Sequence, residues 1–458
     1  MNTLSDSHNT MHVIGEGSYG CVLKPSLKCK TTRPINYKNK ISKIMEKSEA
    51  IIELEEYKRI EKVDKNANYY TGNPEMCIPE ISKKNMNAIK QCKYRNIEDL
   101  RKYYLLIMED GGQSLTVFAD SIYEEIIRGT LRYDSKEFQD YQKIMYNFWE
   151  ECKRLFMGLQ LFLKNNLVHH DLKPQNILYD IQHNRVNYID FGLMTTKKEI
   201  RENSINSYNH NAIIHWSFPP EMPYTNKSEY MKLVKMNKQK KIKVFERFMK
   251  NLSDSENKIN YFFKNTVLDY YKKEESETIK NHLKEYYDLL FKVMTSKKYN
   301  IFLEGVINSI DTYGLGLSLL YVLNKTQLLI DPLFAKNLRS LFLNMVNFNV
   351  MERKNIKTLI YEYNEIMKKY STLFKQNTLR YKESYGKTKK FIEQKLESIE
   401  IENANISNKK LDMDPIPLCP KSYKYNSDIR HCIKSKTKSK TKSKSNTKSK
   451  SNTRKIRM

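Results

Sequence analysis

The stretch that decides the fold lies near the middle of the chain and reads His169-His170-Asp171-Leu172-Lys173-Pro174-Gln175-Asn176. Asp171 and Asn176 stand five residues apart in what the sequence predicts to be a tight loop. In such a loop Asp171 can accept the proton of an attacking hydroxyl, and Asn176 can hold a metal ion. Lys173 stands where it can neutralise charge on a transferring phosphoryl group. The stretch therefore predicts the chemistry of phosphoryl transfer.

A second motif, Asp190-Phe191-Gly192, begins 14 residues after Asn176 and follows a strand predicted over 186–189. A carboxylate at the end of a strand can chelate Mg²⁺ that bridges the β- and γ-phosphates of a nucleotide. The adjacent His169 and His170 cannot share one face of a helix, so they do not predict a metal site. We therefore expect Asn176 and Asp190 to be the metal ligands.

Glycines near the N-terminus form a third motif, Gly15-Glu16-Gly17-Ser18-Tyr19-Gly20-Cys21-Val22. In a dinucleotide-binding fold a helix would begin within such a motif, but here Leu23 and then Pro25 follow. The glycines therefore predict the bend between two strands, where backbone N–H groups can close over nucleotide phosphates. An ordinary hairpin turn is the alternative that this motif alone leaves open.

A fourth candidate is Lys43, which ends a predicted strand within Lys40-Ile41-Ser42-Lys43-Ile44. Its ammonium could bind the α- and β-phosphates, but it would need an acidic partner to hold it in place. We expect Glu53 to be that partner, because it lies on a helix predicted over 48–63 by apolar residues at helical spacing. Glu56, one turn further on, is the alternative.

In this order and at this spacing, the four motifs resemble those of eukaryotic-type protein kinases. The resemblance runs from Val13 to about Tyr370, with long insertions. It implies an α+β fold with two lobes: a small β-rich N-lobe over residues 1–110 and a larger α-helical C-lobe over 111–375. It also implies ATP and Mg²⁺ as cofactors. The ATP-binding residues would be Gly15, Glu16, Gly17, Ser18, Tyr19, Gly20, Val22, Lys43, Glu53, Glu109 and Asp110.

The same resemblance assigns a role to each residue of the two central motifs. Asp171 would be the catalytic base with Lys173 beside it, and Asn176 and Asp190 would hold Mg²⁺. Lysine two residues after the catalytic aspartate implies a serine/threonine kinase, so the expected substrates are proteins with Ser or Thr acceptors. The alternatives are a pseudokinase or basic scaffold that binds ATP and partners without turnover, and a kinase-like enzyme that acts on a small molecule.

Three further residues match structural positions of the family. Glu221 in Pro219-Pro220-Glu221 stands where the family has Ala-Pro-Glu, and Arg353 is its expected partner. Asp311 matches the family's buried helix aspartate.

The family's His-Arg-Asp is His169-His170-Asp171 here, and the missing arginine normally binds a phosphate on the activation loop. A histidine can do so only when protonated, so we expect activity without activation-loop phosphorylation.

The chain has 458 residues and a formal net charge of +27, which is unevenly distributed. A Lys-rich insertion at about 224–300 has helical periodicity, and its stretch 232–250 holds eight basic residues and one acidic residue. This stretch could dock an acidic partner or nucleic acid, with a solvated helical face as the alternative. The segment 376–418 is predicted to be a linker.

The C-terminal segment 419–434, flanked by Cys419 and Cys432, resembles a short basic adaptor motif of proteins from large DNA viruses. The resemblance implies a kinase of the kind encoded by giant DNA viruses. After it, residues 435–458 form a predicted disordered tail of alternating lysine and serine or threonine. Eleven basic residues and no acidic residue lie between 434 and 458, so we expect contact with a polyanion or nucleic acid.

The sequence also indicates where the protein acts. Residues 1–10 are polar and do not predict a secretory signal peptide, and the densest apolar stretch, 314–323, is about half a membrane span. We expect an intracellular soluble protein without a membrane partner, located in the host cytoplasm or a viral factory or packaged in the virion. Its seven cysteines include no CxxC pair, so we expect reduced thiols and no zinc site.

Overall fold

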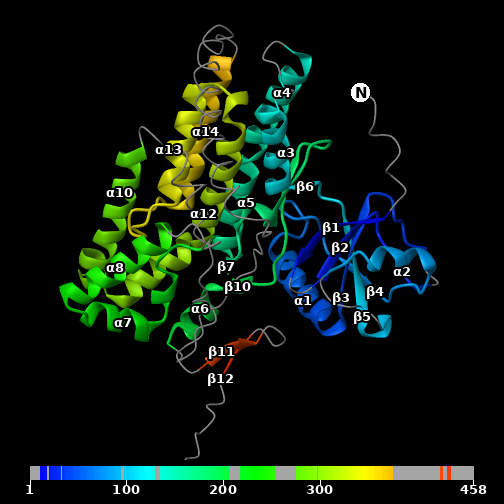
Figure 1. The fold of residues 1–458 in the computed structure, drawn as a ribbon, viewed down its shortest axis with the longest axis horizontal. Helices are drawn as coiled ribbons and strands as arrows, with labels where there is room; N and C mark the ends of the chain where they lie inside the picture. The colour runs from blue at the N-terminus through cyan, green and yellow to red at the C-terminus, as the bar shows by residue number, and fades with distance from the viewer. Residues whose placement is uncertain are drawn as a thin grey trace, which may run out of the picture.

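The computed structural model describes residues 11–17, 20–31, 34–93, 97, 99–128, 131, 135–205, 217–253, 275–296, 298–374, 423–426 and 431–434. Within these residues the fold is mixed α+β, as expected: a small antiparallel sheet occupies the N-terminal part, and helices make up most of the rest. Figure 1 shows this sheet, in blue, to one side of the green and yellow helical region.

The N-terminal sheet has five strands in the order β1-β2-β3-β5-β4, and neighbouring strands run antiparallel. The strands are β1 (His12–Gly17), β2 (Gly20–Lys24), β3 (Lys40–Glu46), β4 (Glu75–Cys77) and β5 (Tyr103–Glu109). Side chains alternate between the two faces. Ile44 and Leu105 pack into the core on one face, while Met45 and Leu106 pack with Ala50 of α1 (Lys47–Val63) on the other. The sheet therefore fixes the position of α1.

Two disulfides cross-link this N-terminal region. Cys21 of β2 is bonded to Cys92, which follows α2 (Lys83–Ile89), and Cys77 of β4 is bonded to Cys29 in the segment between β2 and β3. The expectation of reduced thiols is therefore wrong for these four residues. The partners are 71 and 48 residues apart in the sequence, so only the folded sheet brings them together. Cys152, in contrast, is a buried free thiol.

The helical region is built around α12 (Tyr299–Thr326), whose side chains are buried on nearly every face. The helices that pack against it are α3 (Leu115–Ile127), α5 (Lys153–Lys164) and α13 (Pro332–Met345), while α14 (Ile356–Phe374) packs against α5 and α13. The stretch Tyr299–Leu329 is long and apolar enough to cross a membrane, but 89% of its apolar window is buried inside the protein. Such burial is what the core helix of a soluble domain shows.

Apolar residues at helical spacing between 148 and 163 predict a single amphipathic helix, which is divided in the structure. It forms the end of α4 (Lys136–Glu151) and α5, with Cys152 between them. At this point the backbone N–H of Leu155 donates to the carbonyl of Cys152, a bond across three residues that tightens the turn. Phe148 before the break and Phe156 after it are both fully buried in the core.

Short strands position the loops between the sheet and the helices. They are β6 (Gln113–Ser114), β8 (Ile177–Asp180) and β9 (Arg185–Tyr188) in one sheet, and β7 (Leu167–Val168) with β10 (Thr195–Thr196) in another. Gly112 links β5 to β6 with a φ of 89°, and a Cβ at this position would lie 2.3 Å from the carbonyl oxygen of Tyr179. Only glycine allows the chain to pass this close to β8.

The insertion is helical where the structure describes it, as predicted. Its elements are α7 (Lys227–Lys235), α8 (Lys238–Ser253), α10 (Glu275–Asp288), a π-helical turn (Leu289–Val293) and α11 (Met294–Ser296). At the C-terminus, β11 (Tyr423–Asn426) and β12 (His431–Lys434) form an antiparallel hairpin within the predicted basic motif. The predicted linker at 376–418 and the tail at 435–458 lie outside the described residues.

Candidate functional site

Lys43 and Glu53 form an ion pair between the sheet and α1. Lys43 lies on β3, and its Nζ is 2.6 Å from Oε2 of Glu53. Both side chains are largely shielded, with 16% of Lys43 and 9% of Glu53 exposed. This is the pair expected from the sequence: the carboxylate in the contact belongs to Glu53 and not to the alternative, Glu56. A lysine held in this way is pre-oriented to bind an anion.

Gly20 lets the glycine hairpin pack directly against Lys43. A Cβ at this position would lie 2.9 Å from the carbonyl oxygen of Ile44 and 3.1 Å from Cε of Lys43. Val22, two residues later, stands opposite Lys43 in the pairing of β2 with β3. Directly opposed residues of an antiparallel pair point to the same face, so Val22 and Lys43 share one face of the sheet.

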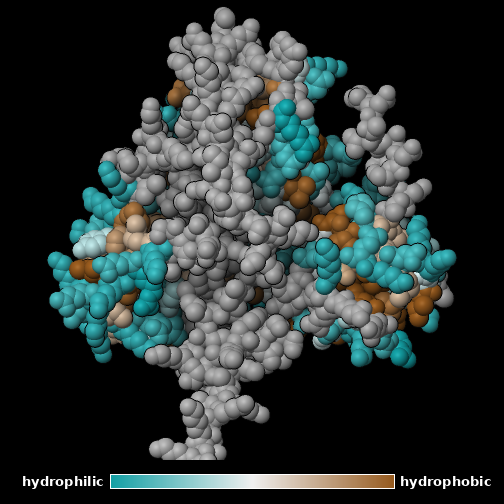
Figure 2. Space-filling model, viewed as in Figure 1, coloured by the Kyte–Doolittle hydropathy of each residue, from teal (hydrophilic) through white to brown (hydrophobic). Residues whose placement is uncertain are grey.

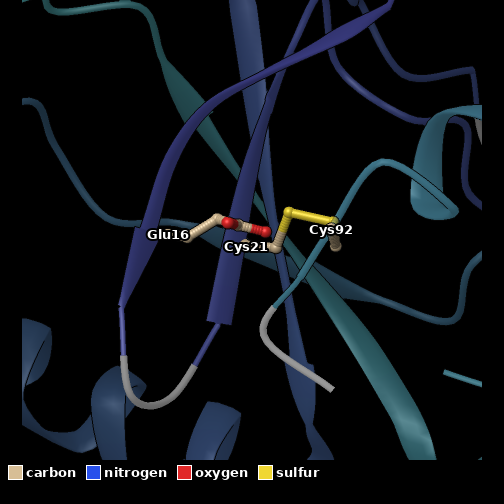
Figure 3. A group of neighbouring side chains, drawn as sticks. All are labelled: Glu16, Cys21 and Cys92. Carbon is tan, nitrogen blue, oxygen red and sulfur yellow. A yellow bond between two sulfur atoms is a disulfide. The ribbon is translucent and has the colours of Figure 1, made fainter. Parts of the chain in front are cut away.

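The glycine motif forms the predicted hairpin of β1 and β2, in which Gly17 stands opposite Gly20. Ser18 and Tyr19, at its tip, lie outside the described residues. Glu16 is exposed, and its carboxylate accepts a hydrogen bond from the backbone N–H of Lys93. Figure 3 shows its side chain directed toward Cys21 and Cys92. Their sulfur atoms are bonded to each other, so this group is a disulfide with a neighbouring carboxylate.

Glu109 and Asp110 lie where β5 leaves the sheet. Both carboxylates form ion pairs with lysines of the sheet: Glu109 with Lys40, and Asp110 with Lys24 at 2.5 Å. The backbone N–H of Asp110 donates to the carbonyl of Asn39. The two side chains therefore hold the linking segment against β2 and β3.

The loop after β7 is held from below by α12. The two oxygens of Asp311 accept hydrogen bonds from the backbone N–H groups of His169, at 2.7 Å, and His170, at 2.8 Å. Gly314, one turn along α12, lies so close that a Cβ there would be 2.4 Å from the carbonyl oxygen of Leu172. His170 has a φ of 67°, a strained conformation for a non-glycine residue that these bonds stabilise.

Hydrogen bonds hold one oxygen of the Asp171 carboxylate in this loop. Its Oδ2 accepts hydrogen bonds from Lys173 Nζ at 3.0 Å and from Asn176 Nδ2 at 2.9 Å. Asn176 Nδ2 also donates to the backbone carbonyl of Asp171 at 2.8 Å. The other oxygen, Asp171 Oδ1, is buried and has no hydrogen-bond partner among the residues that the structure describes. One oxygen is therefore fixed, and the other is left to accept a proton.

Asp190 is brought next to this loop by the backbone of its neighbour Ile189. The backbone N–H of Ile189 donates to the carbonyl of Asn176 at 3.0 Å. The carbonyl oxygen of Ile189 lies 3.1 Å from Nε2 of His169. Asp190 itself has a φ of 60°, which turns the chain away from the direction of β9. The Asn176 side chain donates to Asp171 through Nδ2, so its oxygen and the Asp190 carboxylate supply the hard donors that Mg²⁺ prefers.

Aromatic packing fixes Phe191 after the carboxylate. Its fully buried ring packs edge-on against Tyr57 of α1, with centroids 5.3 Å apart, and against Tyr70 at 6.1 Å. The centroid of the His169 ring lies 5.2 Å from that of Phe191. The cluster joins α1, which holds Glu53, to the loop that holds Asp171. Tyr57 is one of the apolar residues whose helical spacing predicts the helix over 48–63, but that spacing does not indicate its contact with Phe191. Tyr70 has no local motif around it and was not predicted as part of the site.

Burial controls protonation in the loop. It raises the pKa of Asp171 to about 6, an effect that Lys173 opposes and the charge of Asp190 supports. Burial also raises the pKa of Asp311 to about 6, although the two backbone N–H groups that donate to this carboxylate lower its pKa. The pKa values of His169 and His170 are lowered to about 4 by burial. At neutral pH both aspartates are therefore mainly ionised and both histidines are neutral.

The segment after Phe191 is ordered by its own hydrogen bonds. Thr196 caps α6 (Lys197–Ser204): its hydroxyl accepts from the backbone N–H of Glu199, whose carboxylate accepts from the Thr196 N–H. The Thr195 hydroxyl also donates to Glu199, at 3.0 Å. Arg201 of α6 pairs with Glu304 of α12. These contacts stabilise α6 and the two threonines before it, while residues 206–216, Ser207 among them, fall outside the described residues.

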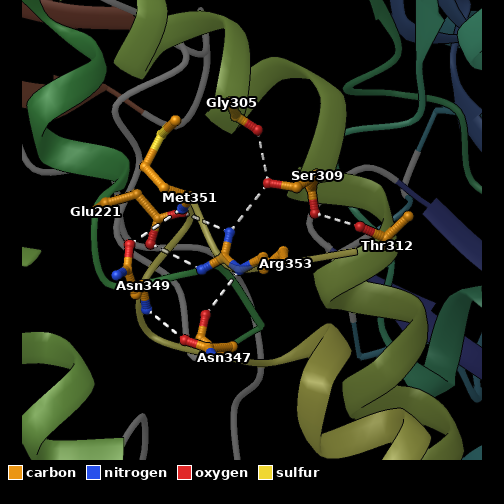
Figure 4. Close-up of polar contacts among 8 residues, drawn as sticks. All are labelled: Glu221, Gly305, Ser309, Thr312, Asn347, Asn349, Met351 and Arg353. Carbon is orange, nitrogen blue, oxygen red and sulfur yellow. Dashed lines mark hydrogen bonds and ion pairs between the residues drawn. The ribbon is translucent and has the colours of Figure 1, made fainter. Parts of the chain in front are cut away.

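Glu221 and Arg353 form a fully buried ion pair below this segment. The guanidinium contacts both carboxylate oxygens, at 2.6 and 3.0 Å, and the two side chains are 0% and 1% exposed. Figure 4 shows the guanidinium also bonded to Ser309 of α12 and to the carbonyl of Asn347. The pair expected from the sequence therefore joins the Pro219-Pro220-Glu221 segment to the core.

Comparison of the sequence with protein-family models gives no match, and comparison with curated proteins gives none either. The functional argument therefore depends on the residues and on their geometry.

Proposed function

We propose that the protein is a serine/threonine protein kinase that transfers the γ-phosphoryl group of ATP-Mg²⁺ to protein hydroxyls. The observation that carries the proposal is the state of Asp171. Lys173 and Asn176 hold one of its oxygens, while the other is buried without a partner among the described residues. A carboxylate arranged in this way can accept one proton from one direction, as a general base requires.

The reaction needs positioning and charge neutralisation more than covalent chemistry by the protein. Asp171 Oδ1 would accept the proton of the Ser or Thr hydroxyl as its oxygen attacks the γ-phosphorus, and ADP would leave with the electrons of the broken P–O bond. Lys173 would neutralise charge on the transferring group. Lys43, held by Glu53, would bind the α- and β-phosphates, and the hairpin of Gly15, Gly17 and Gly20 would cover them.

The Asn176 oxygen and the Asp190 carboxylate would hold Mg²⁺, which would neutralise charge between the β- and γ-phosphates. The donor set fits this ion because both ligands are oxygens and the described site offers no thiolate. The arrangement of a five-stranded sheet beside a helical region would correspond to the two lobes of a kinase. Glu109 and Asp110 would then belong to the hinge beside the adenine.

The substrate class follows from the Pro219-Pro220-Glu221 segment and from Lys173. The ion pair of Glu221 with Arg353 would keep that segment in place as a support for a peptide acceptor. A small-molecule acceptor is the weaker alternative, because such a kinase has no need for a peptide-docking segment. A scaffold without turnover is also weaker, since it would not need a buried carboxylate oxygen free to accept a proton.

The test is transfer of labelled γ-phosphate from ATP-Mg²⁺ to a mixed protein pool and, separately, to a mixture of metabolites. The proposal expects labelled phosphoserine and phosphothreonine after acid hydrolysis of the protein pool. Asp190→Asn, which removes the charged metal ligand, should abolish this transfer. Label that accumulates only in metabolites would replace the proposal with the small-molecule alternative.

A further inference from the structure

The insertion presents a row of basic side chains on α8. Lys240, Lys243 and Arg247 are exposed and recur at spacings of three and four residues. At about 100° per residue they lie within about 60° of one another around the helix axis. We name these three residues the basic face. Neighbours at this spacing are about 5–6 Å apart, so the face is a compact line of positive charge.

The basic face is not neutralised by the described part of the chain. No ion pair with a carboxylate joins Lys240, Lys243 or Arg247 to a described residue, whereas Lys232 on the preceding α7 is paired with Glu229. Between residues 232 and 250 the single acidic residue is Glu246. The charge of the basic face therefore remains available to an external anion.

The adjoining side of α8 holds the helix rigidly on the molecule. Val244, Phe245 and Phe248 pack against the helical core. Phe248 lies 4.1 Å from the ring of Tyr286 and 5.7 Å from that of Phe348, measured between centroids. Because these contacts come from two other segments, α8 cannot turn its basic residues away from solvent without losing them. The basic face is a preformed surface.

The composition of the surface favours phosphate groups over a folded protein partner. Stable protein interfaces depend on apolar or aromatic residues that become buried. Within the described residues of α7 and α8, Met231 is the only large hydrophobic side chain with more than a third of its surface exposed. Figure 2 shows mainly hydrophilic surface over α7 and α8. Among the described residues of these two helices, no aromatic ring is exposed for stacking on the bases of a single strand.

We propose that the basic face binds the phosphate backbone of double-stranded nucleic acid without sequence preference. Lysine and arginine at regular spacing on a convex helix supply the charge that such binding needs, and base readout would need further groups. This binding does not depend on the proposed kinase activity. The basic face would bind in addition to the C-terminal basic tail, so the chain would have two separate contacts with a polyanion.

The test measures binding of the full chain to a fluorescent 20-base-pair DNA duplex by anisotropy, as a function of salt. All variants carry glutamine in place of every lysine and arginine between 434 and 458, which removes the competing contact while keeping the chain length. The test variant is Lys240→Gln/Lys243→Gln/Arg247→Gln. The matched control is Lys83→Gln/Lys84→Gln/Lys90→Gln, because these exposed lysines in and next to α2 lie at the opposite end of the molecule.

Loss of three phosphate contacts should reduce the slope of log K against log salt by about 2.7, and weaken binding at least about tenfold at 50 mM salt. The control should retain both the slope and the affinity, and scrambling the duplex sequence should change neither. The same measurement with an RNA duplex shows whether the basic face binds the phosphate backbone of DNA, of RNA or of both. Equal losses in the test and control variants would overturn the proposal. Binding to polyglutamate, an acidic polymer without phosphate, is measured on the same variants. A test variant that still binds the duplex but no longer binds polyglutamate would also overturn the proposal, because the basic face would then bind acidic protein.

Discussion

The ammonium of Lys43 lies 2.6 Å from the carboxylate of Glu53, and this contact joins the sheet to α1. Glu53→Gln should lower kcat/KM for ATP by about 10- to 100-fold, because Lys43 would lose the charge that orients it. Steady-state kinetics at varied ATP concentration would measure the effect. Glu55→Gln is the matched control, since Glu55 is an exposed residue of the same helix paired with Lys58. A loss of equal size in the control would contradict a specific role for the pair.

The raised pKa of Asp171 predicts how activity depends on pH. A general base must be ionised, so kcat/KM should fall about tenfold per pH unit below the pKa of about 6. Lys173 lowers the pKa of Asp171, and therefore Lys173→Met should move this limb to higher pH. A profile measured between pH 4.5 and 8 checks both statements. Activity that falls by less than twofold down to pH 4.5, as expected for an exposed aspartate with an ordinary pKa near 4, would show that Asp171 does not control the rate.

The buried pair of Glu221 and Arg353 predicts a large effect on stability. Arg353→Met would leave the Glu221 carboxylate buried without its partner, so the free energy of unfolding should fall by about 3–5 kcal/mol. Arg201→Met, which breaks the exposed pair with Glu304, should cost less than about 1 kcal/mol. Urea unfolding compares the two variants. Glu221→Gln/Arg353→Met should recover part of the loss, and no recovery would mean that packing of the arginine, not charge, dominates.

The hydrogen bonds of α6 predict activity without phosphorylation of the segment. Thr195→Ala/Thr196→Asn/Ser204→Ala/Ser207→Ala removes the acceptor hydroxyls, while the asparagine introduced in place of Thr196 keeps an oxygen that can cap the helix. We expect kcat/KM to stay within about threefold of the intact protein, because the cap that orders the segment is preserved. Phosphatase treatment of the intact protein gives an independent measurement. Activity that disappears in both experiments would show that a phosphate is required.

The sequence allowed the local parts of the site to be predicted. Asp171 and Asn176 belong to one short loop, and Lys43 and Glu53 lie on adjacent elements, so their types and spacing could indicate contacts. The hairpin of β1 and β2 followed from the positions of the glycines. These predictions depend on short stretches of chain in which few arrangements are possible.

Contacts between distant segments could not be derived in this way. The disulfide partners Cys21 and Cys92 are 71 residues apart, and neither position has a neighbouring cysteine that would point to the other. Tyr70 reaches Phe191 only because the chain folds back after α1. Asp311 was placed by resemblance alone, since the bond to His169 spans 142 residues. In each case the fold decides the contact.

The most direct test of the proposed activity measures ATP-Mg²⁺ binding and phosphoryl transfer on the same preparations of the intact protein and of Asp171→Asn. Asparagine has the same shape as aspartate but cannot accept the proton, so it separates binding from chemistry. The proposed mechanism predicts an ATP affinity within about twofold of the intact protein and a transfer rate at least about 100-fold lower. Intact protein that binds ATP-Mg²⁺ and transfers no phosphate to any protein would contradict the account and favour a scaffold.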